Sequence, residues 1–413
     1  MTSRLLARGA AALAAGAVVC TVAVPAASAD QIRDRQWALN AFEADAKVWP
    51  VSQGDGVIVA VIDTGVNQDH QDLTGQVLPG ADLSGGNTDG RVDGDGHGTG
   101  MASLIAGHGH GAQAGVEGLA PKAKILPVKV GTQGDDSTPQ PGAFADAIRY
   151  AVEHGAKVVN MSLGGRDFRF DSTLRKAVNY AMSKDVVLVA ATGNTGTEKD
   201  VNYPAAFPGV VAVGAVDSKG AVWGKSTSGP ETTLVAPGVD IYHATAKSSS
   251  GYGEGDGTSD ATAYVSATAA LIRSKYPNLS AGQVINRMIK SATPPGNGTV
   301  VPNNHYGYGT VSPAKALDPN PAVDNGPKDN PLAKRPESKG APHIDEDSDA
   351  TDQPSVAPEA ASGSGGGSDD TGLVIAAVAA GAVVLSASVA AVVMARRRKR
   401  AAAAVPPYGG PGQ

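Results

Sequence analysis

Four polar residues of this sequence have the side chains that acyl transfer requires. They are Asp63, His97, Asn194 and Ser259, and each stands in a tight, glycine-rich setting. A serine nucleophile needs an imidazole to accept its proton and a carboxylate to hold that imidazole in the right tautomer. It also needs a hydrogen-bond donor for the oxyanion that develops during the attack. Carboxylate, imidazole, amide and hydroxyl are therefore all present in this chain.

Each of these residues also has an ordinary structural interpretation. A serine in front of an apolar helical stretch, as Ser259 is, commonly caps the helix. Polar residues at strand ends are commonly turn formers, and a single histidine is more often structural than catalytic. Asp260 follows Ser259 directly, and a carboxylate in a first helical turn complements the helix dipole. A second interpretation of Asp260 is that its charge reaches His97 and favours the imidazolium.

The chain between residues 37 and 317 alternates between strand-like and helix-like segments. Apolar runs typical of buried parallel strands lie at 56–63, 124–130, 157–163, 186–194 and 210–217, and helix-like stretches lie at 142–156, 172–185 and 279–292. This alternation predicts an α/β fold with a mostly parallel sheet covered on both faces. Ligands bind at the carboxyl ends of such strands. Asp63, Ser162 and Asn194 lie at the ends of three of these runs.

Five short motifs resemble those of the subtilisin-like serine proteases. They are "VAVIDTGV", "DGHGTGMASLIAG", "NMSLGG", "AATGN" and "GTSDATAYVSATAALI", in that order between Trp37 and Leu317. The order Asp, His, Ser is also that of subtilisin. The resemblance implies a three-layer subtilisin-like fold and a serine endopeptidase.

The resemblance also implies roles for individual residues. Asp63, His97 and Ser259 would form the triad, with Ser259 both starting a helix and acting as nucleophile. Asn194 would be the oxyanion donor. Substrate-binding positions would be Ser162, Leu163, Gly164 and Gly193, with the backbone at 162–164 forming one wall of a cleft that pairs with an extended peptide.

The sequence departs from the family pattern at several positions. Ala263 stands where the family usually has a proline, and Gly100 where many subtilisins have a second histidine. Asp72 matches a carboxylate of the family's strong calcium site, but the loop at 108–115 lacks that site's asparagines, and calcium needs six or more oxygens. His108 and His110 of this loop could bind a metal, although a solvated glycine loop is the simpler interpretation. We therefore expect no required cofactor and assign no metal ligands; a structural calcium ion is an open alternative that the loop sequence does not support.

The two ends of the 413-residue chain predict export and anchoring. Residues 1–29 have the charged start, apolar run and small-x-small site of a signal peptide, and they contain the only cysteine, Cys20. Residues 30–36 form a short extension before the peptidase domain at 37–317. Residues 318–370 are a linker predicted to be disordered, rich in Pro, Gly, Ser and Asp. Residues 371–395 would form a transmembrane helix, since the uncharged stretch would span about 34 Å. The basic tail at 396–413 would be cytoplasmic, which places the peptidase outside the cell membrane.

This domain plan resembles that of the mycosins, the membrane-anchored proteases of type VII secretion systems. The resemblance implies protein or peptide substrates, a bilayer partner for the C-terminal helix, and contact with type VII membrane components. The net charge of −6 argues against a nucleic-acid partner. Two rival hypotheses are a scaffold subunit with dispensable catalysis and a degradative protease released by cleavage of the linker.

Overall fold

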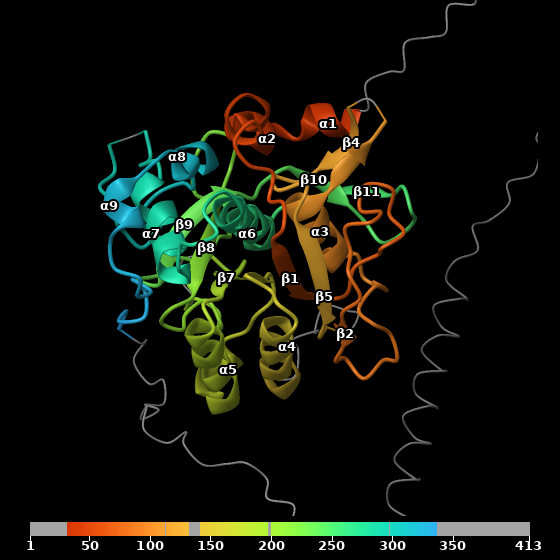
Figure 1. Cartoon of the computed structure of the whole chain (residues 1–413), viewed down its shortest axis with the longest axis horizontal. Coiled ribbons are helices and arrows are strands. Elements are labelled where there is room, and N and C mark those ends of the chain that lie inside the picture. The colour runs from red at the N-terminus through yellow and green to blue at the C-terminus, as the bar shows by residue number, and fades with distance from the viewer. Residues whose placement is uncertain (1–30, 112, 132–140, 197–199, 297, 337–413) are drawn as a thin grey trace, which may run out of the picture. The chain divides into compact units, whose positions relative to one another are not determined.

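The computed structural model describes residues 31–336, except 112, 132–140, 197–199 and 297 (Figure 1). The chain divides into two units, residues 1–344 and 345–413, and all the described residues belong to the first. The predicted signal peptide, most of the predicted linker, the predicted span and the basic tail lie outside the described residues.

A seven-stranded sheet forms the centre of the unit, in the order β2-β5-β1-β6-β7-β8-β9. All neighbouring strands run parallel. The strands are β1 (Ile58–Asp63), β2 (Ala81–Asp82), β5 (Lys124–Lys129), β6 (Val158–Met161), β7 (Val187–Ala191), β8 (Val211–Val216) and β9 (Thr232–Pro237). The five predicted strands are confirmed. β2 and β9 were not predicted from the sequence. Two hairpins were not predicted either: β3 (His108–His110) with β4 (Ala114–Glu117), and β10 (Ile241–Ala244) with β11 (Tyr252–Gly255).

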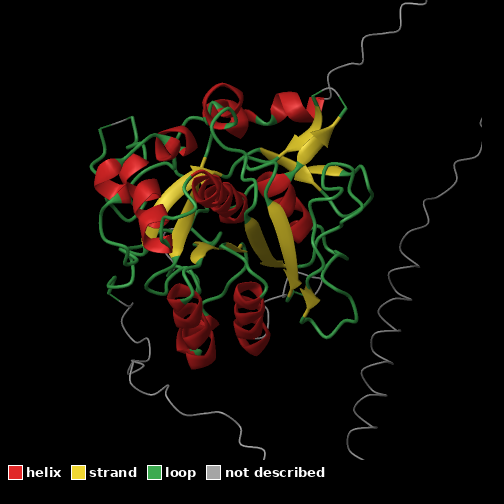
Figure 2. Cartoon of the chain, in the orientation of Figure 1, coloured by secondary structure: helices red, strands yellow, loops and turns green. Residues whose placement is uncertain are grey.

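Helices cover both faces of the sheet, as predicted (Figure 2). Alternate residues of β1 show the division: Val59 and Val61 belong to one buried cluster, and Ala60 and Ile62 to the other. This follows from the strand geometry, in which successive side chains point to opposite faces. Helices α3 (His97–Ala106), α6 (Thr258–Lys275) and α7 (Ala281–Ser291) supply the first cluster, and α4 (Pro141–Glu153) and α5 (Ser172–Ser183) supply the second.

Helix α6 is buried over most of its length and carries Ser259 in its first turn. Every residue from Thr258 to Arg273 is buried. Its alanines, serines and threonines are small, so neighbouring elements approach it on all sides. Its hydroxyls turn inward to backbone or side-chain acceptors, for example from Thr262 to the carbonyl of Thr258 at 2.7 Å.

The start of α7 confirms a detail predicted from the sequence. Ser280 is the N-cap, its hydroxyl accepts from the backbone N–H of Gln283, and the Gln283 side chain accepts from the Ser280 backbone N–H. This is the reciprocal capping box that the spacing of the two residues indicated.

The predicted linker boundary at residue 318 is wrong. After α8 (Pro313–Leu317) the chain forms α9 (Pro321–Asp324) and continues along the domain to Pro336. Buried Arg287 holds α9 by a bidentate pair with Asp324, at 2.6 and 2.7 Å. Arg335 donates to the carbonyls of Glu231, Phe207 and Ala205. Polar composition suggested disorder, but two guanidinium groups with carboxylate and carbonyl acceptors order this segment.

The short N-terminal extension is ordered on the domain from residue 31. Helix α1 (Gln31–Arg35) precedes α2 (Trp37–Ala41), and Arg33 pairs with Glu117 of β4. Gln36 exchanges two hydrogen bonds with the backbone of Glu117. Within the described residues, no helix has both the length and the apolarity needed to cross a membrane.

Candidate active site

The predicted site residues gather at the carboxyl edge of three neighbouring strands. Asp63 is the last residue of β1, Ser162 follows β6, and Asn194 lies shortly after β7. These strands are adjacent and parallel, so their ends lie side by side. Strand order reverses between β1 and β6, and such a switch point is where α/β sheets bind ligands.

His97 begins α3 and is paired with Asp63. Nδ1 of His97 lies 2.7 Å from Oδ1 of Asp63, whose side chain is fully buried, whereas the imidazole is 31% exposed. Because the carboxylate accepts from Nδ1–H, the neutral ring keeps Nε2 free as a base. Gly98 allows this approach, since a Cβ there would collide with the Gly65 carbonyl.

Asp93 fixes the start of α3 against the end of β1, and the sequence analysis missed it. Its Oδ1 accepts from Thr64 Oγ1 at 3.0 Å and from the Gly96 backbone N–H at 2.9 Å. Its Oδ2 accepts from the backbone N–H and the hydroxyl of Thr99. Thr64 follows Asp63, so this network sets His97 relative to its carboxylate. An aspartate just ahead of a predicted helix start was the available signal.

Ser259 lies in the first turn of α6, but it does not cap the helix. The N-cap is Gly257, which has no side-chain capping bond. The Ser259 hydroxyl donates to the Ser162 carbonyl, and the Ser162 hydroxyl donates to the Ser259 carbonyl, both at 3.0 Å. Buried Asn160 of β6 donates to Ser162 and accepts from Ser266 of α6. This network fixes the helix start against the strand end.

Among the described residues, Ser259 has no hydrogen bond to His97; its donor goes to Ser162 instead. The hydroxyl therefore has to rotate away from that carbonyl to reach an imidazole. Such loose geometry is common in the absence of substrate.

Thr258 sets the orientation of the Asn194 carboxamide. Oδ1 of Asn194 accepts from the backbone N–H of Thr258 at 3.0 Å and from its hydroxyl at 2.9 Å. The amide oxygen is thereby occupied, which leaves Nδ2 as the donor beside the start of α6. The sequence analysis did not predict a role for Thr258. A hydroxyl directly before the nucleophile was the only signal.

The four predicted substrate-binding positions differ in what their backbone can offer. Leu163 and Gly164 make no backbone hydrogen bond with the described part of the chain, so no backbone partner there competes for their amides and carbonyls. The Ser162 carbonyl is taken by Ser259. Gly193 donates its N–H to Thr258 Oγ1 and accepts at its carbonyl from Thr227. Gly193 can therefore contribute space but no backbone pairing.

Charges around His97 favour its protonated form. Burial alone would lower the pKa of His97, but the charge and hydrogen bond of Asp63, with smaller contributions from Asp260 and Asp95, raise this pKa to about 9. Burial raises the pKa of Asp260 to about 6, opposed by the charges of His243 and His97.

The residue at the family's calcium position does not fit a calcium ligand. Oδ1 of Asp72 accepts from His110 Nδ1 at 2.6 Å, and Oδ2 accepts from the Val116 N–H and the Tyr252 hydroxyl, each at 2.8 Å. Both oxygens thus face protein donors. No group of three or more His, Cys, Asp or Glu side chains in the described ranges could hold a metal.

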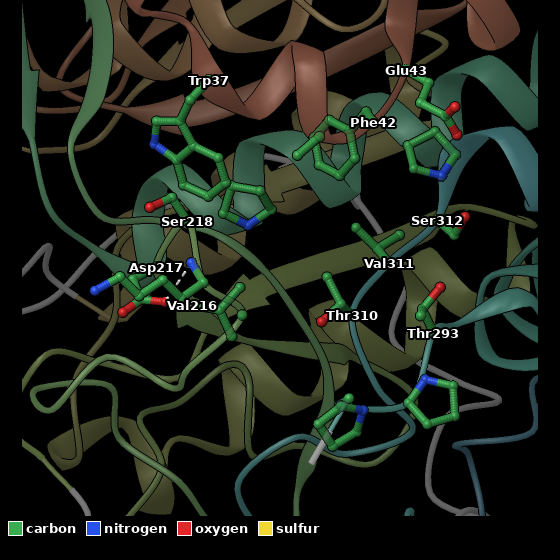
Figure 3. Close-up of a pocket in the computed structure, with 18 of the residues that line it drawn as sticks. Trp37, Phe42, Glu43, Val216, Asp217, Ser218, Thr293, Thr310, Val311 and Ser312 are labelled. Carbon is green, nitrogen blue, oxygen red and sulfur yellow. Dashed lines mark hydrogen bonds between the residues drawn. The ribbon is translucent and has the colours of Figure 1, made fainter. Parts of the chain in front are cut away.

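A separate pocket of about 380 Å³ contains none of the predicted site residues (Figure 3). Trp37 and Phe42 line it on one side, and residues 216–220 and 310–314 line it elsewhere. It lies where β8 ends, two strands beyond β6.

Comparison with known proteins identifies the family to which this chain belongs. The subtilase family (peptidase S8) matches residues 54–309. This chain belongs to the subtilase family. Subtilisin DY of Bacillus licheniformis is 38% identical over 263 residues, 63% of this subtilase and 90% of that protein. Thermitase of Thermoactinomyces vulgaris is 38% identical over 241 residues, 58% of this chain and 83% of the relative.

Solved structures similar to this subtilase include mycosins. MycP1 from Mycobacterium smegmatis superposes with a TM-score of 0.63 at 28% identity, covering 76% of this chain and 91% of that one. The MycP3 protease from the type VII (ESX-3) secretion system gives 0.60 at 33% identity, with coverages of 69% and 87%. The predicted family and the predicted subtilisin-like α/β fold with a mostly parallel central sheet are confirmed, and this subtilase is a serine endopeptidase.

Proposed function

We propose that this subtilase cleaves peptide bonds through Ser259, His97 and Asp63, with Asn194 as the oxyanion donor. The observation that carries this assignment is the 2.7 Å pair between His97 and buried Asp63, at the sheet edge where Ser259 lies in the first turn of α6. The carboxyl edge of the sheet therefore carries a base whose tautomer is fixed, a hydroxyl and an amide donor.

The proposed reaction follows from these positions. A peptide lies extended along Leu163 and Gly164 and pairs with their open backbone groups. The Ser259 hydroxyl leaves the Ser162 carbonyl, gives its proton to Nε2 of His97, and attacks the peptide carbonyl. Asn194 Nδ2 donates to the resulting oxyanion. His97 then protonates the leaving amine, while Asp63 stabilises the imidazolium throughout. Water hydrolyses the acyl-enzyme with the same base.

Labelling with a serine-reactive fluorophosphonate tests this assignment. The wild-type protein should label, and Ser259→Ala should not. Ser274→Ala is a matched control, because Ser274 is a serine near the other end of the same helix, and its hydroxyl donates to the Asp55 carbonyl. Labelling of Ser259→Ala at the wild-type rate would disprove Ser259 as the nucleophile.

We further propose that the enzyme is anchored in the cell membrane and acts in a type VII secretion system. The similarity to MycP1 and MycP3 supports the system, and the uncharged stretch at 371–395 with its basic flank supports the anchor. Its substrates would then be proteins or peptides outside the cytoplasm, and its partners components of the secretion membrane complex.

Complementation distinguishes a protease role from a scaffold role. A deletion strain would receive wild type, Ser259→Ala or a chain ending at residue 362, and both secretion and substrate processing would be measured. Loss of processing with Ser259→Ala supports the protease. Normal secretion with Ser259→Ala, but not with the truncated chain, would favour the scaffold alternative.

Two truncations test the domain boundary. A chain ending at residue 362 should be soluble and active. A chain ending at residue 317 loses α9 and the carboxylate partner of Arg287, Asp324, and should unfold at lower temperature. Equal unfolding temperatures would mean that residues 318–336 add nothing to the domain.

A further inference from the structure

Asp260 is a buried carboxylate beside the proposed nucleophile. It follows Ser259 in the first turn of α6, it is 4% exposed, and its Oδ1 has no hydrogen-bond partner within the described residues. A carboxylate that only served the helix dipole would have no need of burial. We propose that Asp260 is a positioning residue for proton transfer: its charge, together with that of Asp63, stabilises the imidazolium of His97. This inference rests on the proposed role of His97 as base.

The packing around Asp260 differs from the family pattern in a connected way. Gly100 stands where many subtilisins have a histidine, and the imidazole of His243 from β10 occupies that space. A Cβ at residue 100 would lie 2.8 Å from His243 Nδ1, and a Cβ at Gly255 would lie 3.2 Å from its Nε2. Nδ1 of His243 lies 2.9 Å from the Ala244 carbonyl. Two glycines thus make room for a second imidazole, whose charge acts on Asp260.

The titratable groups that face Asp260 come from four places. They are His243 of β10, His97 of α3, Asp256 just before α6, and Tyr264 one turn further along α6. Both imidazoles favour the charged carboxylate, whereas burial and Asp256 oppose it. The balance leaves the pKa of Asp260 at about 6, so the side chain is mostly ionised at neutral and alkaline pH.

Three carboxylates from different parts of the fold interact with the charge of the His97 imidazole. Asp63 at the end of β1 interacts most strongly, followed by Asp260 of α6 and Asp95 in the turn before α3. An anion favours the imidazolium, so removing one lowers the pKa of His97. His97 accepts a proton only when neutral, and kcat/KM falls as pH drops below this pKa. Removing the charge of Asp260 should therefore move the acid limb of kcat/KM to lower pH.

The experiment compares the acid limbs of wild type, Asp260→Asn and Asp95→Asn at 0.1 and 1 M salt. Asp95 is the matched control, because it is also a carboxylate acting on His97 but is exposed to solvent. At 1 M salt the screening length is about 3 Å, so an exposed charge loses its effect and a buried one keeps most of it. We expect Asp260→Asn to shift the limb down by about one pH unit at both salts. Asp95→Asn should give a smaller shift that disappears at 1 M.

Direct titration separates this inference from the proposed function. The His97 imidazole is followed by NMR in a Ser259→Ala protein, with and without Asp260→Asn, so no activity is needed. A lower His97 pKa in the double variant supports the inference. Should Asp260→Asn fail to fold, the smaller Asp260→Ser takes its place. Coincident titrations, or an Asp260 shift that vanishes in 1 M salt as the Asp95 shift does, would overturn it.

Discussion

The described residues of this subtilase include two histidine–aspartate pairs with nearly the same local geometry. His97 Nδ1 lies 2.7 Å from Asp63, and His110 Nδ1 lies 2.6 Å from Asp72. Both aspartates are fully buried, and the imidazoles are 31% and 36% exposed. The pair alone therefore does not identify a catalytic site.

The two pairs differ in what surrounds them. Oδ2 of Asp72 accepts from the Val116 N–H and the Tyr252 hydroxyl, whereas Oδ2 of Asp63 has no partner among the described residues. His97 lies at the carboxyl edge of the parallel sheet, where Ser259 and Asn194 also lie. His110 lies on an antiparallel hairpin, and its pair joins that hairpin to Asp72 and β11. Under the proposed function, the same chemistry serves catalysis at one place and attachment of a hairpin at the other.

The largest expected difference between the pairs is in turnover. Ser259→Ala, His97→Ala and Asp63→Asn should each lower kcat by about 10⁴- to 10⁶-fold, and the losses should not add, because the three residues act as a unit. His110→Gln should leave kcat unchanged. Steady-state hydrolysis of a peptide substrate measures both. Near-wild-type hydrolysis by purified Ser259→Ala would rule out the triad.

Asn194 provides the next largest test, because no equivalent donor is proposed beside His110. Asn194→Ala should lower kcat by about 10²- to 10³-fold with little change in KM. Thr258→Val should have a smaller effect in the same direction, since only the backbone N–H of Thr258 would then hold the amide oxygen. A change confined to KM would mean that Asn194 is only a turn residue.

The pair between His110 and Asp72 should instead contribute to the free energy of unfolding. His110→Ala leaves one oxygen of buried Asp72 without its donor, which should lower the free energy of unfolding by about 1–3 kcal/mol. His110→Gln keeps a donor and should lower it less. Urea unfolding followed by circular dichroism measures both variants. Equal stability of wild type and His110→Ala would show that the pair does not hold the hairpin.

The smallest expected effect is that of calcium at Asp72. Protein donors already meet both oxygens of this carboxylate, so a chelator should not change the unfolding temperature. The measurement is thermal unfolding in excess EDTA and in millimolar calcium. A rise of more than about 2 °C with calcium, roughly 1 kcal/mol for a domain of this size, would contradict this interpretation.

Local sequence patterns were sufficient for much of the fold. The apolar runs found five of the seven strands, because a strand buried on both faces is apolar throughout. β9 was missed: its residues, "TTLVAP", are buried although two are threonines. The end of the domain was also missed, because Arg287 and Arg335 order a polar segment through partners distant in sequence.

The sequence by itself determined which chemical groups are available and which strand ends carry them, because residue types and apolar periodicity are local properties. Only the tertiary structure decided how these groups are used. In the folded chain Thr258 sets the orientation of the Asn194 amide, and the Ser259 hydroxyl donates to the Ser162 carbonyl. The imidazole of His243 occupies the space beside Gly100. The tertiary structure also made one histidine–aspartate pair part of the site and the other a structural contact. Hydrogen-bond partners and burial depend on segments far apart in the chain, and no local pattern specifies them.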